Sequence, residues 1–424
     1  MSPVRMLYSL CLYLLLPLLL LRLLLRSLQQ PQYRRRWRER LGFVPLPPDA
    51  RPLICLHAVS VGETMAARTL VEALLQAFPG HQLYLTSTTP TGSATVLRLF
   101  GEQVGHAYLP YDLPGAVGRF LGRVRPQLLL IMETEIWPNL YAGCHQRNIA
   151  LMLVNARLSA RSASAYRRVA PLVAETLAHV SRIAARHETD ARHFQALGAD
   201  PERVWVAGNI KFALQPDPVL VAAGRAFRLQ SGRRQVWCAG STHEGEEHRL
   251  LAVHRNLRRE YPELLLILVP RHPERFEAVA ELCRELGLSM VRRSKGERLQ
   301  PQTAVVLGDS MGELLMWYAA SDMAFVGGSL VAVGGHNPLE AAVLGLPVLS
   351  GPHVHNFTDI YPALAAVGAV TLVESLPELE HHLRLWLADP EAVQQQGTAG
   401  QAFFERYREG VGALVTAVRR LLVP

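Results

Sequence analysis

The sequence predicts an α/β protein with two doubly wound domains, preceded by one long apolar helix. Short apolar runs alternate with helical patterns, as they do in a parallel sheet wrapped by helices. The chain has 424 residues, which is more than one hydrophobic core usually serves. The proline-rich segment 215–218 separates two series of apolar runs, because its prolines cannot continue a helix or a central strand.

Each series of apolar runs predicts the strands of one sheet. The first predicted strands are 53–56, 83–86, 128–132, 149–155 and 204–207, and the second are 236–239, 264–270, 304–307, 324–326 and 347–349. The predicted domains are therefore an anchor at 1–30, a first Rossmann-like domain at 31–215 and a second at 216–424. We expect the tail from Pro390 to Leu422 to be helical and able to pack back on the first domain.

The amino-terminal apolar segment runs from Met6 to Leu25 and is broken only by Ser9, Pro17 and Arg22. At 1.5 Å per residue it spans roughly 30 Å, the thickness of a hydrocarbon core. A signal peptide is not indicated, because no small-residue cleavage site follows the run. The arginines of the segment 34–40 follow it and place the remaining chain in the cytoplasm.

Whether this anchor spans the membrane or lies in its interface stays open at this point. The apolar run carries no candidate catalytic group. We therefore expect the anchor to deliver the protein to its substrate rather than to shape the site.

The charge balance favours anionic partners. Lys and Arg number 44 and Asp and Glu 36, a formal net charge of +8. The dense basic run 34–38 adjoins the apolar segment, so a membrane surface is predicted rather than nucleic acid. Five scattered cysteines form no C-x-x-C or Cys/His cluster, which predicts neither a zinc site nor disulfides.

Four predicted strand ends share one pattern, an N-cap residue followed three positions later by glutamate. These segments are Ser60 to Glu63, Ser241 to Glu244, Ser310 to Glu313 and Asn337 to Glu340. The glutamates either close capping boxes or serve a ligand, since helix N-termini at strand ends also bind anions. Neither G-x-G-x-x-G nor a P-loop is present, which leaves a nucleotide-sugar site.

Other polar side chains also follow predicted strands. Glu133 and Glu135 come after an apolar run, and we expect one to face the site and the other to cap the next helix. Arg271 follows Pro270 in a rigid turn suited to a phosphate. Lys211 precedes the linker and either faces the site or is a solvated surface lysine.

Together these motifs resemble one family. The segments that carry the resemblance are 57–63, 132–139, 208–211, 269–275, 308–313 and 327–340. They are similar to those of the Kdo (3-deoxy-D-manno-octulosonic acid) transferases of lipopolysaccharide synthesis. The resemblance runs from the apolar anchor to at least Asp359.

The resemblance implies a GT-B fold, in which the two Rossmann-like domains face each other across a cleft. It implies inverting transfer of Kdo from CMP-Kdo to a tetra-acylated lipid A precursor, lipid IVA. The site of action is then the cytoplasmic leaflet of a Gram-negative inner membrane. No metal, cofactor, nucleic acid or protein partner is expected.

The resemblance also implies roles for individual residues. Glu63 matches the general base, and Glu133 and Lys211 match positions that stabilise the transition state. The CMP-binding positions are Pro270, Arg271, Met311, Gly312, Glu313, Asn337, Pro338, Leu339 and Glu340. These roles agree with the chemistry, because inversion needs a base for the acceptor hydroxyl and cations for the departing phosphate.

Two alternatives remain at this point. One is another GT-B nucleotide-sugar enzyme, similar to lipid A disaccharide synthase or to an epimerase. The other is a tethered binding protein that senses phosphorylated lipid without turnover. The number of Kdo residues transferred, the acyl-chain preference and the oligomeric state also stay open.

Overall fold

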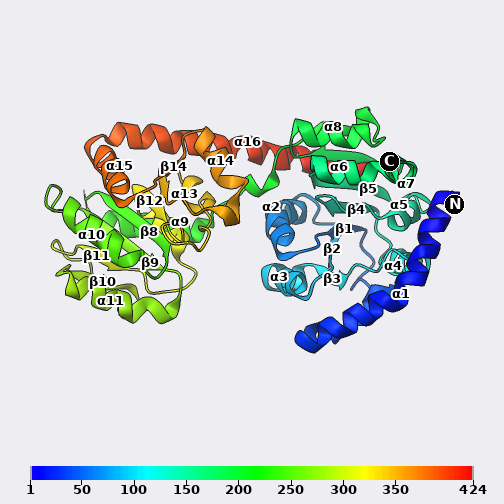
Figure 1. Cartoon of the computed structure of the whole chain (residues 1–424), viewed down its shortest axis with the longest axis horizontal. Helices are drawn as coiled ribbons and strands as arrows, with labels where there is room; N and C mark the ends of the chain where they lie inside the picture. Colours follow the sequence, from blue (N-terminus) through cyan, green and yellow to red (C-terminus); the bar gives the residue numbers. More distant parts are fainter. Residues whose placement is uncertain (1, 233, 423–424) are drawn as a thin grey trace. The chain divides into compact units, whose positions relative to one another are not determined.

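The computed structural model describes residues 2–232 and 234–422. It divides into two compact units, Met1–Ala213 with Tyr407–Pro424, and Leu214–Arg406. The division falls two residues before the predicted one, and the described residues 407–422 belong to the first unit rather than to the second. The reason is helix α16 (Pro390–Leu422; Figure 1), whose Val411, Leu414 and Val418 lie in the apolar core of the first unit.

The first unit contains a seven-stranded parallel sheet in the order β3-β2-β1-β4-β5-β6-β7. Its strands are β1 (Leu53–His57), β2 (Gln82–Ser87), β3 (Gly105–Tyr108), β4 (Leu128–Met132), β5 (Ala150–Ala156), β6 (Arg182–Ala185) and β7 (Val204–Val206). The strand order reverses between β1 and β4. In doubly wound folds, ligands bind at the carboxyl ends of the strands at such a reversal.

Helices cover both faces of this sheet, so its central strands are apolar on both sides. Within β1, Cys55 belongs to one apolar cluster and Ile54 to the other, as strand alternation requires. The α-helices are α1 (Pro3–Gln29), α2 (Val61–Ala77), α3 (Pro90–Phe100), α4 (Pro114–Val124), α5 (Pro138–His145), α6 (Ala160–Arg167), α7 (Ala170–Ala178) and α8 (Glu188–Ala196). The 3₁₀ turns are η1 (Pro31–Arg34), η2 (Trp37–Leu41), η3 (Gly101–Gln103), η4 (Pro201–Arg203) and η5 (Ile210–Phe212).

The predicted anchor is helix α1. Among the described residues, Pro3–Leu28 is the one helical stretch long and apolar enough to cross a membrane, with a mean hydropathy of 2.1. Its contacts with α5 and α7 place it along the surface of the first unit (Figure 1).

The second unit repeats the architecture with the strand order β10-β11-β9-β8-β12-β13-β14, all parallel. Its strands are β8 (Val236–Thr242), β9 (Leu265–Pro270), β10 (Met290–Arg292), β11 (Val305–Leu307), β12 (Met323–Val326), β13 (Val348–Ser350) and β14 (Val370–Leu372). Its helices are α9 (Pro218–Gln230), α10 (Glu247–Leu257), α11 (Phe276–Glu285), α12 (Leu314–Ala319), α13 (Leu339–Ala342), α14 (Ile360–Ala366) and α15 (Leu376–Ala388). The turns η6 (Pro273–Arg275), η7 (Arg293–Lys295) and η8 (His355–Phe357) complete it. The predicted fold class of two doubly wound α/β domains is confirmed.

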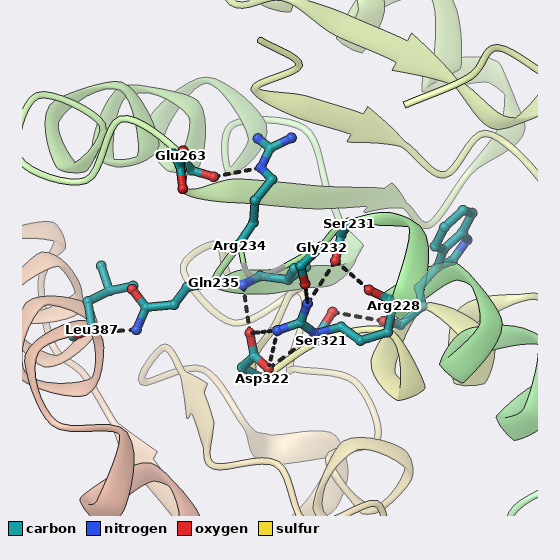
Figure 2. Close-up of polar contacts among 11 residues, drawn as sticks. Arg228, Ser231, Gly232, Arg234, Gln235, Glu263, Ser321, Asp322 and Leu387 are labelled. Carbon is teal, nitrogen blue, oxygen red and sulfur yellow. Dashed lines mark hydrogen bonds and ion pairs between the residues drawn. The ribbon is translucent and has the colours of Figure 1, made fainter. Parts of the chain in front are cut away.

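A partly exposed ion pair fixes the start of the second unit (Figure 2). Arg228, near the end of α9, donates from Nη2 to both carboxylate oxygens of Asp322, at 3.1 Å each. The same carboxylate accepts the Val236 backbone N–H at 2.8 Å. One side chain thereby joins α9 to the first strand of the sheet and to the residue before β12.

Candidate active site

The first candidate site lies at the carboxyl ends of β1 and β4, the neighbouring strands between which the strand order of the first unit reverses. Glu63 stands in the first turn of α2, and its Oε2 accepts the Val59 N–H at 2.9 Å. The Glu63 N–H in turn reaches Ser60 Oγ at 3.4 Å. The predicted capping box is therefore present at this junction, and capping and a catalytic role are not exclusive for Glu63.

Glu133 and Lys211 form an ion pair beside Glu63. Glu133 directly follows β4 with a left-handed backbone, φ 56°, and its Oε1 lies 3.5 Å from Lys211 Nζ. Both side chains are partly exposed, at 23% and 30%. Lys211 is thus paired with Glu133 rather than a free surface lysine, and the transition-state roles that the resemblance implies for both residues stay predictions.

Two asparagines that the sequence did not single out hold the Lys211 turn. Asn209 Oδ1 accepts the Lys211 N–H at 3.2 Å, and Asn155 Oδ1 accepts the Ile210 N–H at 3.2 Å. Both asparagines are buried, and within the described chain both Nδ2 atoms have no hydrogen-bond partner. Their position after strands was the available signal, but asparagine there is also an ordinary turn residue.

The expected division of roles between Glu133 and Glu135 is wrong in one respect. The N-cap residue of α5 is Trp137, with no side-chain cap, so Glu135 does not cap that helix. Glu135 is instead a third carboxyl of the cluster. Burial, followed by the nearby Glu63 charge, raises the pKa of Glu135 to about 7.

Burial also raises the pKa of the Glu63 carboxyl, and the negative charge of Glu133 adds to the increase. The Val59 N–H and the Lys211 ammonium oppose it. A carboxylate with a raised pKa is a stronger base than an ordinary surface glutamate. The cluster can therefore accept a proton from a hydroxyl group that is placed against it.

The second candidate site is a cavity of about 300 Å³ in the second unit, at the carboxyl ends of β8, β9 and β11. Six of the predicted nucleotide-binding residues line it, namely Pro270, Arg271, Met311, Gly312, Asn337 and Glu340. The structure therefore brings together residues from three separate motifs. Pro338, Leu339 and Glu313 are not among the lining residues.

Glu340 and Arg271 give this cavity one negative and one positive group. Burial raises the pKa of Glu340, against the opposing effects of Asn337 and the Arg271 charge. Asn337 also fixes the loop, because its Oδ1 accepts the Leu339 N–H at 3.2 Å. Helix α13 begins at Leu339, and Pro338 is the residue directly before it.

The Glu313 carboxylate is held by protein groups. Arg293 donates to both of its oxygens, at 3.0 and 2.8 Å, and the Ser310 hydroxyl donates to Oε2. The Arg293 hydrogen bond is the main reason that the pKa of Glu313 is lowered. A nucleotide role for Glu313 stays a prediction, and this geometry favours an indirect one in which it holds the loop with Ser310.

The predicted capping box at Ser241 to Glu244 is wrong. Ser241 lies within β8 in a left-handed conformation, φ 56°, and α10 begins only at Glu247. Glu244 is exposed and pairs with Arg275 at 3.2 Å. The spacing matched the capping pattern by chance, because the strand extends further than its apolar run.

Glu246 is the residue at this junction that the sequence reasoning missed. It is fully buried, and its carboxylate accepts the His243 N–H and three successive N–H groups of the loop after β12. These come from Gly328, Ser329 and Leu330, at 2.7, 3.0 and 2.9 Å. Glu246 therefore fixes the glycine-rich loop whose continuation carries Asn337 and Glu340.

Comparison with known proteins identifies the family. A sequence model of 3-deoxy-D-manno-octulosonic-acid transferase (kdotransferase) matches residues 35–214. A 3-deoxy-D-manno-octulosonic acid transferase of Haemophilus influenzae is 42% identical over 415 residues, 97% of this chain and 96% of the relative. One from Bordetella pertussis is 39% identical over 84% of each chain. The chain belongs to the Kdo transferase family.

The fold has wider likenesses. The UDP-GlcNAc 2-epimerase of Neisseria meningitidis, solved with UDP-GlcNAc, covers 88% of this Kdo transferase chain and 99% of its own. The TM-score is 0.54 at 15% identity, which shows a shared fold alone. Family membership makes the protein a glycosyltransferase. It favours Kdo transfer over the epimerase-like and lipid-sensing alternatives.

A histidine pair borders the cavity of this Kdo transferase. The Nε2 atoms of His243 and His336 are 2.7 Å apart, and burial lowers the pKa of both rings, that of His336 to about 4. One neutral ring can then donate to the other. Among the described residues, no group of three or more His, Cys, Asp and Glu side chains has a metal-binding arrangement.

Proposed function

We propose that this glycosyltransferase moves Kdo, with inversion, from CMP-Kdo to the lipid A precursor lipid IVA. The observation that carries the proposal is the Glu63 carboxylate with a raised pKa beside the Glu133–Lys211 ion pair. Family membership indicates Kdo as the transferred sugar. Inverting transfer to a hydroxyl requires a base, and the Glu63 carboxylate is a suitable one.

CMP-Kdo is the proposed donor, bound in the cavity of the second unit. Glu340 and Arg271 both line this cavity. In the proposal Glu340 accepts hydrogen bonds from the ribose hydroxyls and Arg271 faces the phosphate. The backbone at Gly312 has φ 83° and open space around it, so a ligand can approach the chain closely there.

Glu63 is the proposed general base. It takes the proton of the acceptor hydroxyl while that oxygen bonds to the anomeric carbon of Kdo. The bond from this carbon to the CMP phosphate breaks on the opposite face, and the electron pair leaves with CMP. Lys211, held by Glu133, and Arg271 are the cations proposed to stabilise the departing negative charge. No metal or other cofactor takes part in this mechanism.

The proposed place of action is the cytoplasmic leaflet of the inner membrane. Support comes from the apolar helix α1 and from the basic residues that follow it, which favour an anionic leaflet. No nucleic acid or protein partner is part of the proposal.

The proposed function is tested with the purified full chain in detergent, CMP-Kdo and lipid IVA. We expect mass spectrometry to find the lipid heavier by one or more Kdo units, with CMP released in equal number. The same assay counts the Kdo residues transferred. Conversion of donor alone, or transfer only from a UDP-sugar, contradicts the proposal.

The Glu340 and Glu313 side chains should differ in their effect on the donor. We expect Glu340→Gln to weaken CMP binding by up to about a hundredfold, the equivalent of one lost charge-assisted bond. Glu313→Gln should weaken it less, because its carboxylate is turned to Arg293. Calorimetric titration of CMP into each folded variant measures both, and equal losses contradict the assignment.

The pH dependence should report the carboxyl cluster. Glu63 acts as a base only when deprotonated, so kcat/KM should fall as the pH drops through its raised pKa. Repulsion between the Glu63 and Glu135 carboxylates is mutual, so Glu135→Gln should lower the pKa of Glu63 and move the acid limb to lower pH. A pH profile of kcat/KM checks this, and an acid limb that does not move counts against Glu63 as the base.

A further inference from the structure

The amino-terminal end of α1 is fixed to the first unit by polar side chains. The Tyr8 hydroxyl donates to Asp112 Oδ2 at 3.0 Å, and the Ser9 hydroxyl donates to Asn139 Oδ1 at 3.1 Å. Asp112 is buried and also accepts the Asn139 N–H at 2.9 Å. These contacts hold the beginning of α1 against α5.

The carboxyl-terminal end of α1 contacts the turn η1 that follows it. Ser27 is buried, and its Oγ accepts a hydrogen bond from Arg34 Nε at 2.9 Å. The guanidinium of Arg26 lies 6.0 Å from the Tyr33 ring. Helix α1 runs along the first unit with its beginning held against α5. A stripe of exposed leucines that includes Leu7, Leu14 and Leu21 faces outward.

Two cavities lie beside the carboxyl-terminal half of α1, between it and later residues of the first unit. The first, of about 400 Å³, is lined largely by apolar side chains, among them Leu20, Leu24 and Trp37. The second, of about 220 Å³, is lined by three arginines together with Thr88, Thr89 and Tyr111. Both share Leu23 and Tyr33, so an apolar pocket and a basic pocket adjoin.

The three arginines of the basic pocket are Arg22, Arg26 and Arg40. Arg40 is 94% buried, with 6% exposed. Its Nη2 donates to the Thr88 carbonyl at 2.9 Å, and its guanidinium lies 4.5 Å from the Tyr108 ring. Neither contact neutralises its charge, and among the described residues its buried Nε has no partner. A buried cation in this state favours an anionic ligand.

The basic pocket adjoins the proposed base. The hydroxyls of Thr88 and Thr89 both donate to the Val59 carbonyl, at 3.3 and 3.4 Å. The N–H of the same Val59 donates to Glu63. Val59 therefore contacts both the threonines that line the pocket and the Glu63 carboxylate. A headgroup held in the pocket would lie next to the residue that binds Glu63.

We propose that these two cavities are the subsites for the acceptor lipid. Arg22, Arg26 and Arg40 bind a phosphate of its sugar headgroup, and the apolar pocket takes part of an acyl chain. The proposal rests on the proposed function, and it commits to the phosphorylated acceptor rather than to the bulk phospholipid. It differs from the expectation that the anchor only delivers the protein, because in this proposal α1 forms one wall of both subsites.

The test uses the full chain with the exposed arginines replaced, Arg22→Gln/Arg26→Gln, in a non-ionic detergent. Binding of lipid IVA and of its dephosphorylated form is measured by titration without donor. We expect the unmodified protein to bind the phosphorylated form at least about tenfold more tightly, by analogy with charge-assisted bonds. The double variant should lose this preference and bind the dephosphorylated form within about twofold of the unmodified protein.

A matched control removes the same charge outside the pockets. Arg35 and Arg38 are exposed and line neither cavity, so Arg35→Gln/Arg38→Gln should keep the preference for the phosphorylated lipid. Equal losses in both double variants would indicate general attraction to anions and overturn the proposal. Competition by an anionic phospholipid at the same concentration as lipid IVA also overturns it.

Binding and transfer together separate this proposal from the proposed function. If the unmodified protein binds with an arginine-dependent phosphate preference but transfers no Kdo, the subsite stands and the proposed function fails. If transfer occurs while the double variant keeps the phosphate preference, the proposed function stands and the subsite fails.

Discussion

Replacing Glu63 with glutamine should lower kcat about 10²- to 10⁴-fold, the range typical of a lost general base. The amide keeps the size of the side chain and an oxygen that can accept the Val59 N–H. It cannot take a proton from the acceptor hydroxyl. CMP binding should remain nearly unchanged, because the cavity proposed to bind the donor is lined by residues of the second unit. Steady-state kinetics and calorimetric titration of CMP measure the two properties.

A matched control separates catalysis from helix capping. Ser60→Ala removes the side chain that caps α2, and loss of an N-cap typically costs about 1 kcal/mol of stability. We expect this variant to unfold more easily while keeping most of its kcat. If Glu63→Gln instead keeps activity within about threefold, well inside the range expected for a lost base, Glu63 is a capping residue only.

The sheets were predictable where strands carry long apolar runs. All ten predicted strands are present among the described residues, because central strands of covered parallel sheets are apolar on both faces. The sequence reasoning missed β3, β6, β10 and β14. Three of these lie at sheet edges, where a strand of three or four residues buries less surface and carries a weaker pattern. Segments such as Met290–Arg292 contain too little apolar sequence to stand out.

The site was predictable where a motif is local. Glu63 with Ser60, and Asn337 with Glu340, interact within four residues, so spacing alone reveals them. Glu246 escaped because its partners lie more than eighty residues further along the chain. The cavities proposed as acceptor subsites were hidden for the same reason.

The wall formed by α1 illustrates this limit. Arg22 and Arg40 are read in the sequence as flanks of an anchor, and only the docking of α1 brings both to one pocket. The polar contacts that dock it, such as Tyr8 with Asp112, join residues about one hundred positions apart. Apolar composition predicted membrane association, but it contains no information on which face of the helix meets the protein.

Lys211→Met should lower kcat about 10²- to 10³-fold, the loss typical when one preorganised charge is removed from a transition state. Lys211 is held 3.5 Å from Glu133, and the turn is fixed by Asn209. The partly exposed ion pair contributes little to stability, so the variant should fold. Kinetics with saturating CMP-Kdo measure the effect.

A second variant decides whether Lys211 acts on the reaction or only on Glu133. Without its ammonium partner, Glu133 is an unpaired negative charge near Glu63, and it would raise the pKa of Glu63 further. If this were the whole effect, Glu133→Gln/Lys211→Met would restore activity, because no unpaired charge remains. A charge that stabilises the transition state predicts the opposite, and the double variant should be at least as impaired as Lys211→Met. Recovery to within about tenfold of the unmodified enzyme, short of the loss expected for a missing transition-state charge, would assign Lys211 to the ion pair alone.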